Sequence, residues 1–142
     1  MEEGFLPKMY TVTKSIDFCY GHRLLNYEGK CKNLHGHNAK VEIDITTDRL
    51  DQRGMAYDFA EIKGKVKTWI DAELDHRMIL NEKDSALPFL KEMNEPFFLL
   101  KENPTAENIA KLIFEKVEAL GFPVKEVRLW ETPDSCATYR HG

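Results

Sequence analysis

The sequence has few cysteines, no long apolar run and no excess of positive charge, and each absence excludes a class of protein. Its three cysteines, Cys19, Cys31 and Cys136, are an odd and sparse set among 142 residues. They cannot form a disulfide framework, so we expect free thiols in a reducing compartment. No apolar stretch approaches the roughly 20 residues that a membrane helix requires, which argues against a membrane-spanning protein.

The charge balance argues against a nucleic-acid partner. The chain carries 20 Lys and Arg against 24 Asp and Glu, a formal net charge of -4, and it has no dense run of basic residues. Its first residues, MEEGFLPKMY, contain neither the apolar core nor the small-residue cleavage site that is typical of a secretion signal. We therefore expect a cytoplasmic protein that acts on a small molecule, not on nucleic acid or a membrane.

The composition that remains is that of one globular domain. A chain of 142 residues can enclose a single hydrophobic core. The apolar fraction of 42% and the charged fraction of 31% are ordinary for such a domain. We find no internal repeat and no low-complexity segment, so we expect one domain over residues 1–142.

The spacing of apolar residues predicts strands at both ends of the chain and two helices between them. Period-2 alternation predicts an antiparallel strand pair over 10–18 and 39–47, and two short runs at 126–131 and 135–140 predict a C-terminal hairpin. Helical spacing predicts helices over 57–74 and 104–122, with Asp58 and Thr105 as N-caps. Residues 82–103 are expected to form a loop with at most one short element. This order favours an α+β fold, an antiparallel sheet covered on one face by two helices.

A metal site is predicted from three histidines. His35 and His37 stand two residues apart at the entry to the second strand, so an extended backbone points both imidazoles to one face. His22 lies just past the end of the first strand, and antiparallel pairing would bring it beside them. Three imidazoles with an open fourth position are typical of a catalytic zinc site. The alternative is that His-x-His is a chance pattern of surface histidines.

Cys31 has two interpretations. As a fourth ligand it would close the metal shell, and the protein would then be a non-catalytic, zinc-stabilised binding module. As a free loop thiol near a cation it would have a lowered pKa and act as a thiolate nucleophile or base, and this second interpretation explains its placement better. Cys19 and Cys136 lie in strand-like runs and are interpreted as small buried residues.

Two further carboxylates stand out, those of Asp75 and Glu131. Asp75 and His76 follow the first helix; they are either an ordinary helix end or a proton shuttle in which the carboxylate orients the imidazole. Glu131 shares a strand face with Val127 and Leu129, so it is either an exposed strand end or an inward carboxylate that binds the N–H groups of a ligand.

These segments occur together and in order along the chain. The blocks HRL, CKNLHGHN, YDFAEIK, LDHR, PTAEN and WETPDS resemble the superfamily of 6-pyruvoyltetrahydropterin and 6-carboxytetrahydropterin synthases. The resemblance implies a tunnelling fold (T-fold), in which a four-stranded antiparallel sheet carries two helices on one face. It also implies a homohexamer, because three subunits would close a barrel and two such trimers would stack.

The resemblance also implies roles for individual residues. His22, His35 and His37 would bind Zn²⁺, and Cys31 with Asp75 and His76 would be the catalytic set. Glu131, aided by Thr105, would hold the pterin of the substrate 7,8-dihydroneopterin triphosphate. Arg23, Lys30 and Lys32 are close enough in sequence to bind phosphate, although surface charges are the simpler interpretation.

The spacing within CKNLHGH helps to choose between the 6-carboxy and the 6-pyruvoyl branches of this superfamily. Three residues separate Cys31 from His35, as in the bacterial and archaeal 6-carboxytetrahydropterin synthases that the chain resembles, whereas the animal 6-pyruvoyl enzymes have a longer insert. The favoured branch releases acetaldehyde and feeds the synthesis of 7-deazapurines such as queuosine. A folate-linked branch has a glutamate in the role of the cysteine; Cys31 argues against it, although Glu28 lies nearby.

Overall fold

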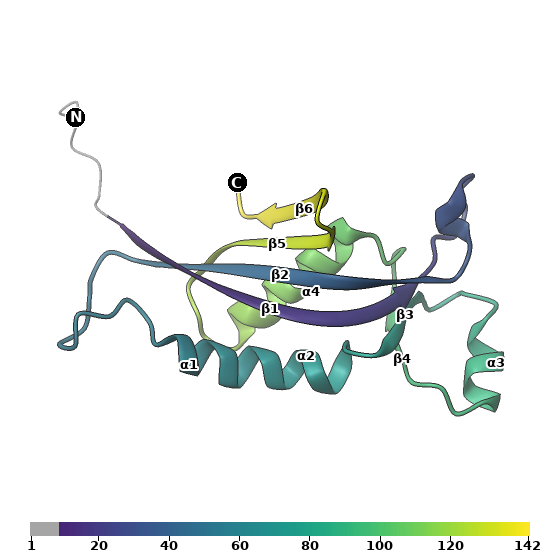
Figure 1. The fold of residues 1–142 in the computed structure, drawn as a ribbon, viewed down its shortest axis with the longest axis horizontal. Coiled ribbons are helices and arrows are strands. Elements are labelled where there is room, and N and C mark those ends of the chain that lie inside the picture. The colour runs from purple at the N-terminus through teal and green to yellow at the C-terminus, as the bar shows by residue number, and fades with distance from the viewer. Residues whose placement is uncertain (1–8) are drawn as a thin grey trace.

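The computed structural model describes residues 9–142, which form a curled mixed sheet with helices packed against it (Figure 1). The strands are β1 (Tyr10–His22), β2 (His35–Thr47), β3 (Arg77–Asn81), β4 (Phe97–Leu100), β5 (Val124–Thr132) and β6 (Ser135–Arg140). The helices are η1 (Lys30–Lys32, a 3₁₀ turn), α1 (Phe59–Ile62), η2 (Lys63–Lys67, a π-helical segment), α2 (Thr68–Glu73), α3 (Leu87–Glu92) and α4 (Ala106–Ala119).

The sheet has the strand order β4-β3-β1-β2-β5-β6. Its centre is the antiparallel pair of β1 and β2, whose register runs without interruption from Tyr10 opposite Thr47 to His22 opposite His35. β5 pairs antiparallel with β2, and β6 pairs antiparallel with β5. On the other side, β3 runs parallel to β1 and β4 runs parallel to β3. The predicted strand pair and C-terminal hairpin are confirmed.

The predicted strand count and the predicted loop over residues 82–103 were wrong. The described residues contain six strands, not four, because β3 and β4 extend the sheet, and α3 lies between them. These two strands have only five and four residues, and their apolar residues are consecutive, so they show no period-2 alternation. β3 is held by pairing with β1, which is distant in sequence, and β4 is held by pairing with β3, so only the tertiary structure defines them.

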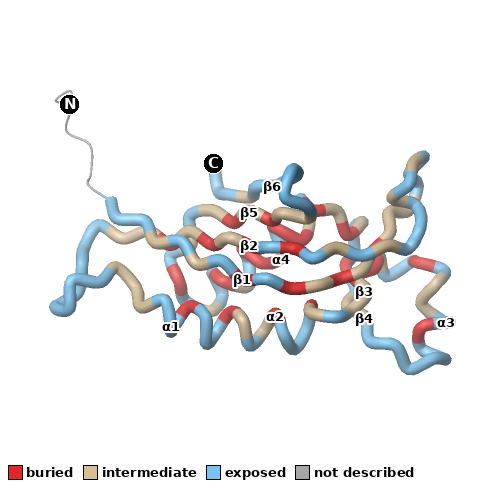
Figure 2. Tube along the Cα trace, viewed as in Figure 1, coloured by how far each residue is buried: buried red, intermediate tan, exposed pale blue. Residues whose placement is uncertain are grey.

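One hydrophobic core lies between the sheet and the helices. Alternate residues of β1, β2 and β5 are buried, and they pack against the apolar stripes of the α1–α2 segment and of α4 (Figure 2). The fully buried side chains include Val41, Ile43 and Leu129 from the sheet and Ile70 and Ile113 from the helices. The α+β class, with helices on one face of the sheet, is therefore confirmed.

Both helical segments begin at the predicted caps. The Asp58 carboxylate accepts a hydrogen bond from the Ala60 N–H at 2.8 Å, and the Thr105 hydroxyl accepts one from the Asn108 N–H at 3.1 Å. Such caps satisfy backbone donors that have no partner within the first helical turn. Because Pro104 immediately precedes the Thr105 cap, the start of α4 also fixes the position of the Pro104 carbonyl.

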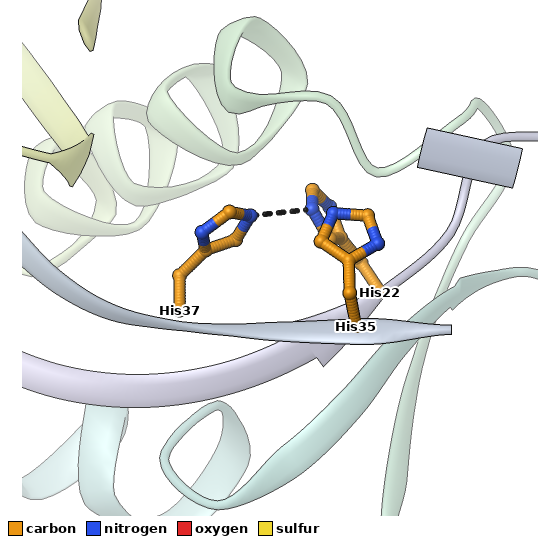
Figure 3. Close-up of side chains that lie close together, drawn as sticks. All are labelled: His22, His35 and His37. Carbon is orange, nitrogen blue, oxygen red and sulfur yellow. Dashed lines mark hydrogen bonds between the residues drawn. The ribbon is translucent and has the colours of Figure 1, made fainter. Parts of the chain in front are cut away.

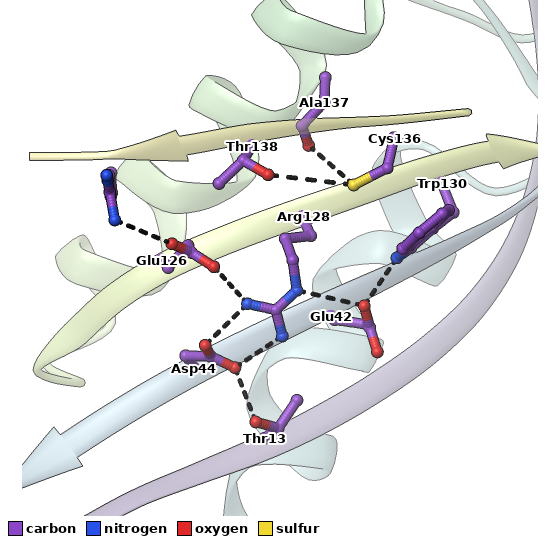
Figure 4. Close-up of polar contacts among 10 residues, drawn as sticks. Thr13, Glu42, Asp44, Glu126, Arg128, Trp130, Cys136, Ala137 and Thr138 are labelled. Carbon is purple, nitrogen blue, oxygen red and sulfur yellow. Dashed lines mark hydrogen bonds and ion pairs between the residues drawn. The ribbon is translucent and has the colours of Figure 1, made fainter. Parts of the chain in front are cut away.

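The sheet face opposite the core is polar where β2 and β5 pair. Arg128 binds Asp44 through both terminal nitrogens, at 2.7 and 2.9 Å, and also contacts Glu126 and Glu42 (Figure 4). The Trp130 indole N–H donates to Glu42 at 2.6 Å. These contacts neutralise part of the negative charge on this face.

Residues 1–10, in which we expect no secretion signal, lie outside the described residues except for Met9 and Tyr10. Across residues 9–142, no helix combines the length and apolar character needed to cross a bilayer.

Candidate active site

The pairing of β1 with β2 brings the three predicted histidines together. His22 lies directly opposite His35, and His37 lies opposite Tyr20. His22 is the last residue of β1 and not a loop residue beyond it, as the sequence had suggested. All three imidazoles thus project from extended backbone on the same side of the sheet, the side that carries the core.

The three rings converge on one point (Figure 3). One ligand atom of each ring lies within 4.8 Å of the corresponding atoms of the other two, and Nε2 of His37 is 3.1 Å from Nε2 of His22. A tetrahedral zinc ion with bonds of about 2.1 Å holds its nitrogen ligands about 3.4 Å apart. The spacing of the rings therefore fits a metal site with small adjustments of the side chains.

Backbone carbonyls set the orientation of two of the rings. Nδ1 of His22, which is only 3% exposed, lies 2.6 Å from the carbonyl oxygen of Pro104, and Nδ1 of His35 lies 2.7 Å from that of Asn33. A carbonyl can only accept, so each Nδ1 carries the hydrogen, and in the neutral imidazole each Nε2 then keeps its lone pair. This tautomer is the one that a metal requires, and such carbonyl contacts are typical of metal-binding histidines.

Glu131 lies beside the triad. Its Oε2 atom is 2.9 Å from Nε2 of His37 and 3.2 Å from Nε2 of His22, and it accepts a hydrogen bond from the Tyr20 hydroxyl at 2.9 Å. Burial acts to raise the pKa of Glu131, but the contact with His22, whose Nε2 donates only when the imidazole is protonated, and the hydrogen bond from Tyr20 outweigh it and keep the pKa below its usual value. The carboxylate is therefore ionised and able to accept hydrogen bonds.

Tyr20 was missed by the sequence analysis. Burial, and then the neighbouring Glu131 charge, raise the pKa of its hydroxyl, so it remains a hydrogen-bond donor to that carboxylate. The signal was present, because Tyr20 stands two residues before His22 and therefore shares its strand face. Burial also lowers the pKa of His37, more than the Glu131 charge raises it, which favours the neutral imidazole that binds metals.

Asp75 and His76 form a dyad between α2 and β3. Nδ1 of His76 lies 2.9 Å from Oδ2 of Asp75, and the His76 side chain is 78% exposed. His76 has a positive φ of 59°, a conformation that is uncommon for residues other than glycine. The arrangement has the geometry of a carboxylate that orients an imidazole.

Cys31 lies in η1, in the loop between β1 and β2, and is half-buried. Its backbone carbonyl accepts a hydrogen bond from the Leu24 N–H at 2.8 Å, which closes the loop. Its thiol belongs neither to the histidine cluster nor to the cluster around Asp75 and His76. An open pocket of about 570 Å³, however, is lined by atoms of His35, His37 and His76.

The cysteines and Arg23 were also singled out from the sequence. All three cysteines are free thiols, as expected, but Cys136 is exposed and not buried, because it lies on the edge strand β6. Arg23 is not a free surface charge: its guanidinium binds the carboxylate of Asp84, whose side chain is fully buried. Asp84 was missed because nothing in its local sequence distinguishes it from other loop acids.

Together, the fold and the site define a class: small α+β proteins with a curled mixed sheet, here with three imidazoles converging on its central strand pair. Solved structures share this architecture. The 6-pyruvoyl tetrahydropterin synthase of Caenorhabditis elegans superposes with a TM-score of 0.72 at 27% sequence identity, over 97% of this chain and 99% of that one. The T-fold is therefore the fold of this chain.

Sequence comparison identifies the family within this class. The sequence profile of 6-pyruvoyl tetrahydropterin synthase matches residues 11–142. A 6-carboxy-5,6,7,8-tetrahydropterin synthase of Rickettsia bellii is 39% identical, over 89% of this chain and 96% of the relative, and one of Haemophilus influenzae is 34% identical, over 93% and 99%. The chain belongs to the 6-pyruvoyl tetrahydropterin synthase family, as its motifs had indicated.

Proposed function

We propose that this chain is a zinc-dependent 6-carboxy-5,6,7,8-tetrahydropterin synthase, a lyase. Its substrate would be 7,8-dihydroneopterin triphosphate, which would lose triphosphate and acetaldehyde, and its product would enter the synthesis of queuosine and other 7-deazapurines. The observation that carries the proposal is the convergence of three imidazoles on one point of the β1–β2 pair. The names of the relatives from Rickettsia bellii and Haemophilus influenzae support the choice of reaction.

The donor set supports zinc as the cofactor. His22, His35 and His37 would supply three neutral imidazoles, and the fourth position would remain for substrate oxygen. Bound zinc would act as a Lewis acid that polarises the hydroxyl groups of the substrate side chain.

The protein residues would then bind the substrate and move its protons. The Cys31 thiolate would remove a proton from the side chain of the substrate, and His76, oriented by Asp75, would relay one. Glu131, which stays ionised, would hold adjacent N–H groups of the pterin by two parallel hydrogen bonds. Thr105 would assist Glu131 from the N-cap position of α4, although its hydroxyl already serves as the cap of that helix.

The assembly we propose is a homohexamer in the cytoplasm, built from two stacked trimers of this single-domain chain. Separation of Cys31 from the Asp75–His76 pair within one chain supports an active site that draws on more than one subunit. Light scattering on a gel-filtration column should give the mass of six 16.5 kDa chains. A monomer at micromolar concentration would contradict the assembly.

The decisive experiment is to incubate the zinc-loaded protein with 7,8-dihydroneopterin triphosphate and to assay for acetaldehyde and for 6-carboxytetrahydropterin. Equimolar formation of both is expected. A product that retains its three-carbon side chain would instead identify a 6-pyruvoyltetrahydropterin synthase, the activity named for the Caenorhabditis elegans neighbour. Absence of any turnover, with zinc bound, would favour a zinc-stabilised binding module.

A further inference from the structure

A second cluster of metal-ligating side chains lies around Cys19, where β1 meets the segment between α2 and β3. Cys19, Asp75 and His76 each offer one ligand atom, and these sulfur, oxygen and nitrogen atoms all lie within 4.8 Å of one another. Cys19 lies opposite Asn38 in the strand register. The next pair along the strands is Tyr20 and His37, and its side chains lie on the face that carries the triad. Because successive strand residues point to opposite faces, the Cys19 thiol points away from the face of the three imidazoles, and the two clusters have no residue in common.

Backbone hydrogen bonds lock the three residues of this cluster together. The Cys19 N–H donates to Oδ1 of Asp75 at 2.9 Å, and the His76 N–H donates to the Cys19 carbonyl at 2.7 Å. The positive φ of His76 directs the chain back toward β1 immediately after α2. A site whose ligands are already held in place needs little reorganisation to accept an ion.

The cluster is open to solvent and contains an anionic ligand. It lines a shallow pocket of about 410 Å³ that Asp17 and Asn38 also line. Oδ1 of Asp75 accepts from the Cys19 N–H at 2.9 Å, and its Oδ2 lies 2.9 Å from Nδ1 of His76. The Cys19 thiol donates to the amide oxygen of Asn38 at 3.0 Å, so it points into the pocket and not into the core.

We propose that Cys19, Asp75 and His76 form a second metal site, which takes a thiophilic divalent cation of the zinc class. Thiolate, imidazole and carboxylate are the three ligand types that Zn²⁺ accepts in proteins, and the thiol proton is lost when the metal binds. The triad, by contrast, supplies nitrogen ligands alone. The ion at the second site would engage both side chains of the dyad, which, if the proposed function holds, would prevent their role as a proton relay.

Cobalt(II) distinguishes the two sites, because a bound thiolate gives a near-ultraviolet charge-transfer absorption that imidazole ligands do not give. We expect the unmodified full-length protein to bind two equivalents of Co²⁺ per chain, with this absorption accompanying one of them. Cys19→Ser, which keeps a hydrogen-bond donor toward Asn38, should lose the absorption and one equivalent. Cys136→Ser and Cys31→Ser are matched controls that should retain both.

Further variants keep the test informative if Cys19→Ser folds poorly. Asp75→Asn retains an oxygen that can accept the Cys19 N–H, and His76→Asn tolerates a positive φ. Each replaces one of three direct ligands and should weaken the thiolate-linked equivalent by at least the ~10-fold that loss of an outer-shell partner causes. His35→Ala should remove the other equivalent alone, so failure of the triad is distinguishable from failure of this site. A single equivalent in the unmodified protein, or an absorption that survives Cys19→Ser and disappears in Cys31→Ser, would overturn the proposal.

Discussion

At the scale of single residues, the buried carboxylate of Asp84 anchors the chain beside the triad. Its Oδ2 accepts from Nε of Arg23 at 2.8 Å, and its Oδ1 also accepts from the Ala86 N–H at 2.8 Å. Arg23 follows His22 directly, so this ion pair ties the end of β1 to the segment that precedes α3. The Arg23 side chain remains 22% exposed, which makes the pair half-buried.

Asp84→Asn should destabilise the protein by about 2 kcal/mol at neutral pH, because it removes the charge that pairs with Arg23 but preserves the shape of the side chain. The hydrogen bonds from Arg23, opposed by burial, hold the pKa of Asp84 below its usual value. The ionised group therefore stabilises the fold fully above about pH 4, the usual carboxyl pKa. That contribution is lost as the pH falls through the lower folded-state pKa.

Denaturant unfolding at neutral and acidic pH measures this difference. The difference in free energy of unfolding between the unmodified protein and Asp84→Asn should become smaller in acid. The matched control is Asp71→Asn, which removes an exposed pair with Lys67 and should cost at most about 0.5 kcal/mol at either pH. A gap that stays constant with pH would show that the charge of Asp84 is not the cause.

Cys31 provides a second test at this scale, because it separates an enzyme from a structural zinc module. If the thiol acts in catalysis, Cys31→Ala should retain the zinc bound by the triad and the fold but reduce turnover at least 100-fold. Metal analysis, circular dichroism and the acetaldehyde assay on the same preparation measure the three properties. Loss of metal together with unfolding would indicate instead that Cys31 closes the zinc shell.

At the scale of elements, the site is built where the start of α4 meets the end of β1. The Thr105 cap places the Pro104 carbonyl 2.6 Å from Nδ1 of His22. The Asn103 side chain clamps the neighbouring loop, because it donates to the carbonyl of Leu25 at 2.8 Å and accepts from the Leu25 N–H at 3.0 Å. A helix end and a strand end thus fix one another and orient an imidazole.

Removal of this cap should therefore affect metal binding as well as stability. Thr105→Ala should cost about 1 kcal/mol, the usual effect of losing an N-cap, and should lower the zinc affinity of the triad about 10-fold through movement of Pro104. Asp58→Ala removes the cap of α1 and should cost a similar free energy without changing that affinity. Calorimetric zinc titration of both variants provides the comparison, and equal affinities would contradict the coupling.

At the scale of the whole molecule, metal binding should be linked to stability. The triad joins β1 to β2, and Glu131 of β5 lies against it, so a bound ion would cross-link the two central strands of the sheet. Zinc at a free concentration about 1,000 times its dissociation constant should add about 4 kcal/mol to the free energy of unfolding. Thermal unfolding with zinc and with a chelator measures this shift.

His35→Ala tests whether the triad causes the stabilisation. The variant should lose most of the zinc-dependent shift, because two imidazoles bind zinc far more weakly than three. Its unfolding in chelator should resemble that of the unmodified protein, since His35 lies at the end of a strand and outside the core. An undiminished shift would show that the stabilising ion binds elsewhere.

The sequence by itself determined the elements whose periodic patterns are long. β1, β2, the C-terminal hairpin and the two main helical segments each present an apolar stripe to one core, and the caps at Asp58 and Thr105 mark where the helices begin. The two-residue spacing of His35 and His37 also fixed which face they share, because strand geometry has a period of two. The family was identified from the same motifs.

Only the tertiary structure decided the parts that depend on contacts between distant residues. The short strand β3 forms because β1 provides a pairing edge, and β4 forms because it pairs in turn with β3. The buried carboxylate of Asp84 is satisfied by Arg23, which is 61 residues away in sequence. The positions of Glu131 and Tyr20 against the triad, and of Cys19 against Asp75 and His76, likewise arise from strand register. Local sequence encodes conformation, whereas these neighbours are set by how the folded elements pack.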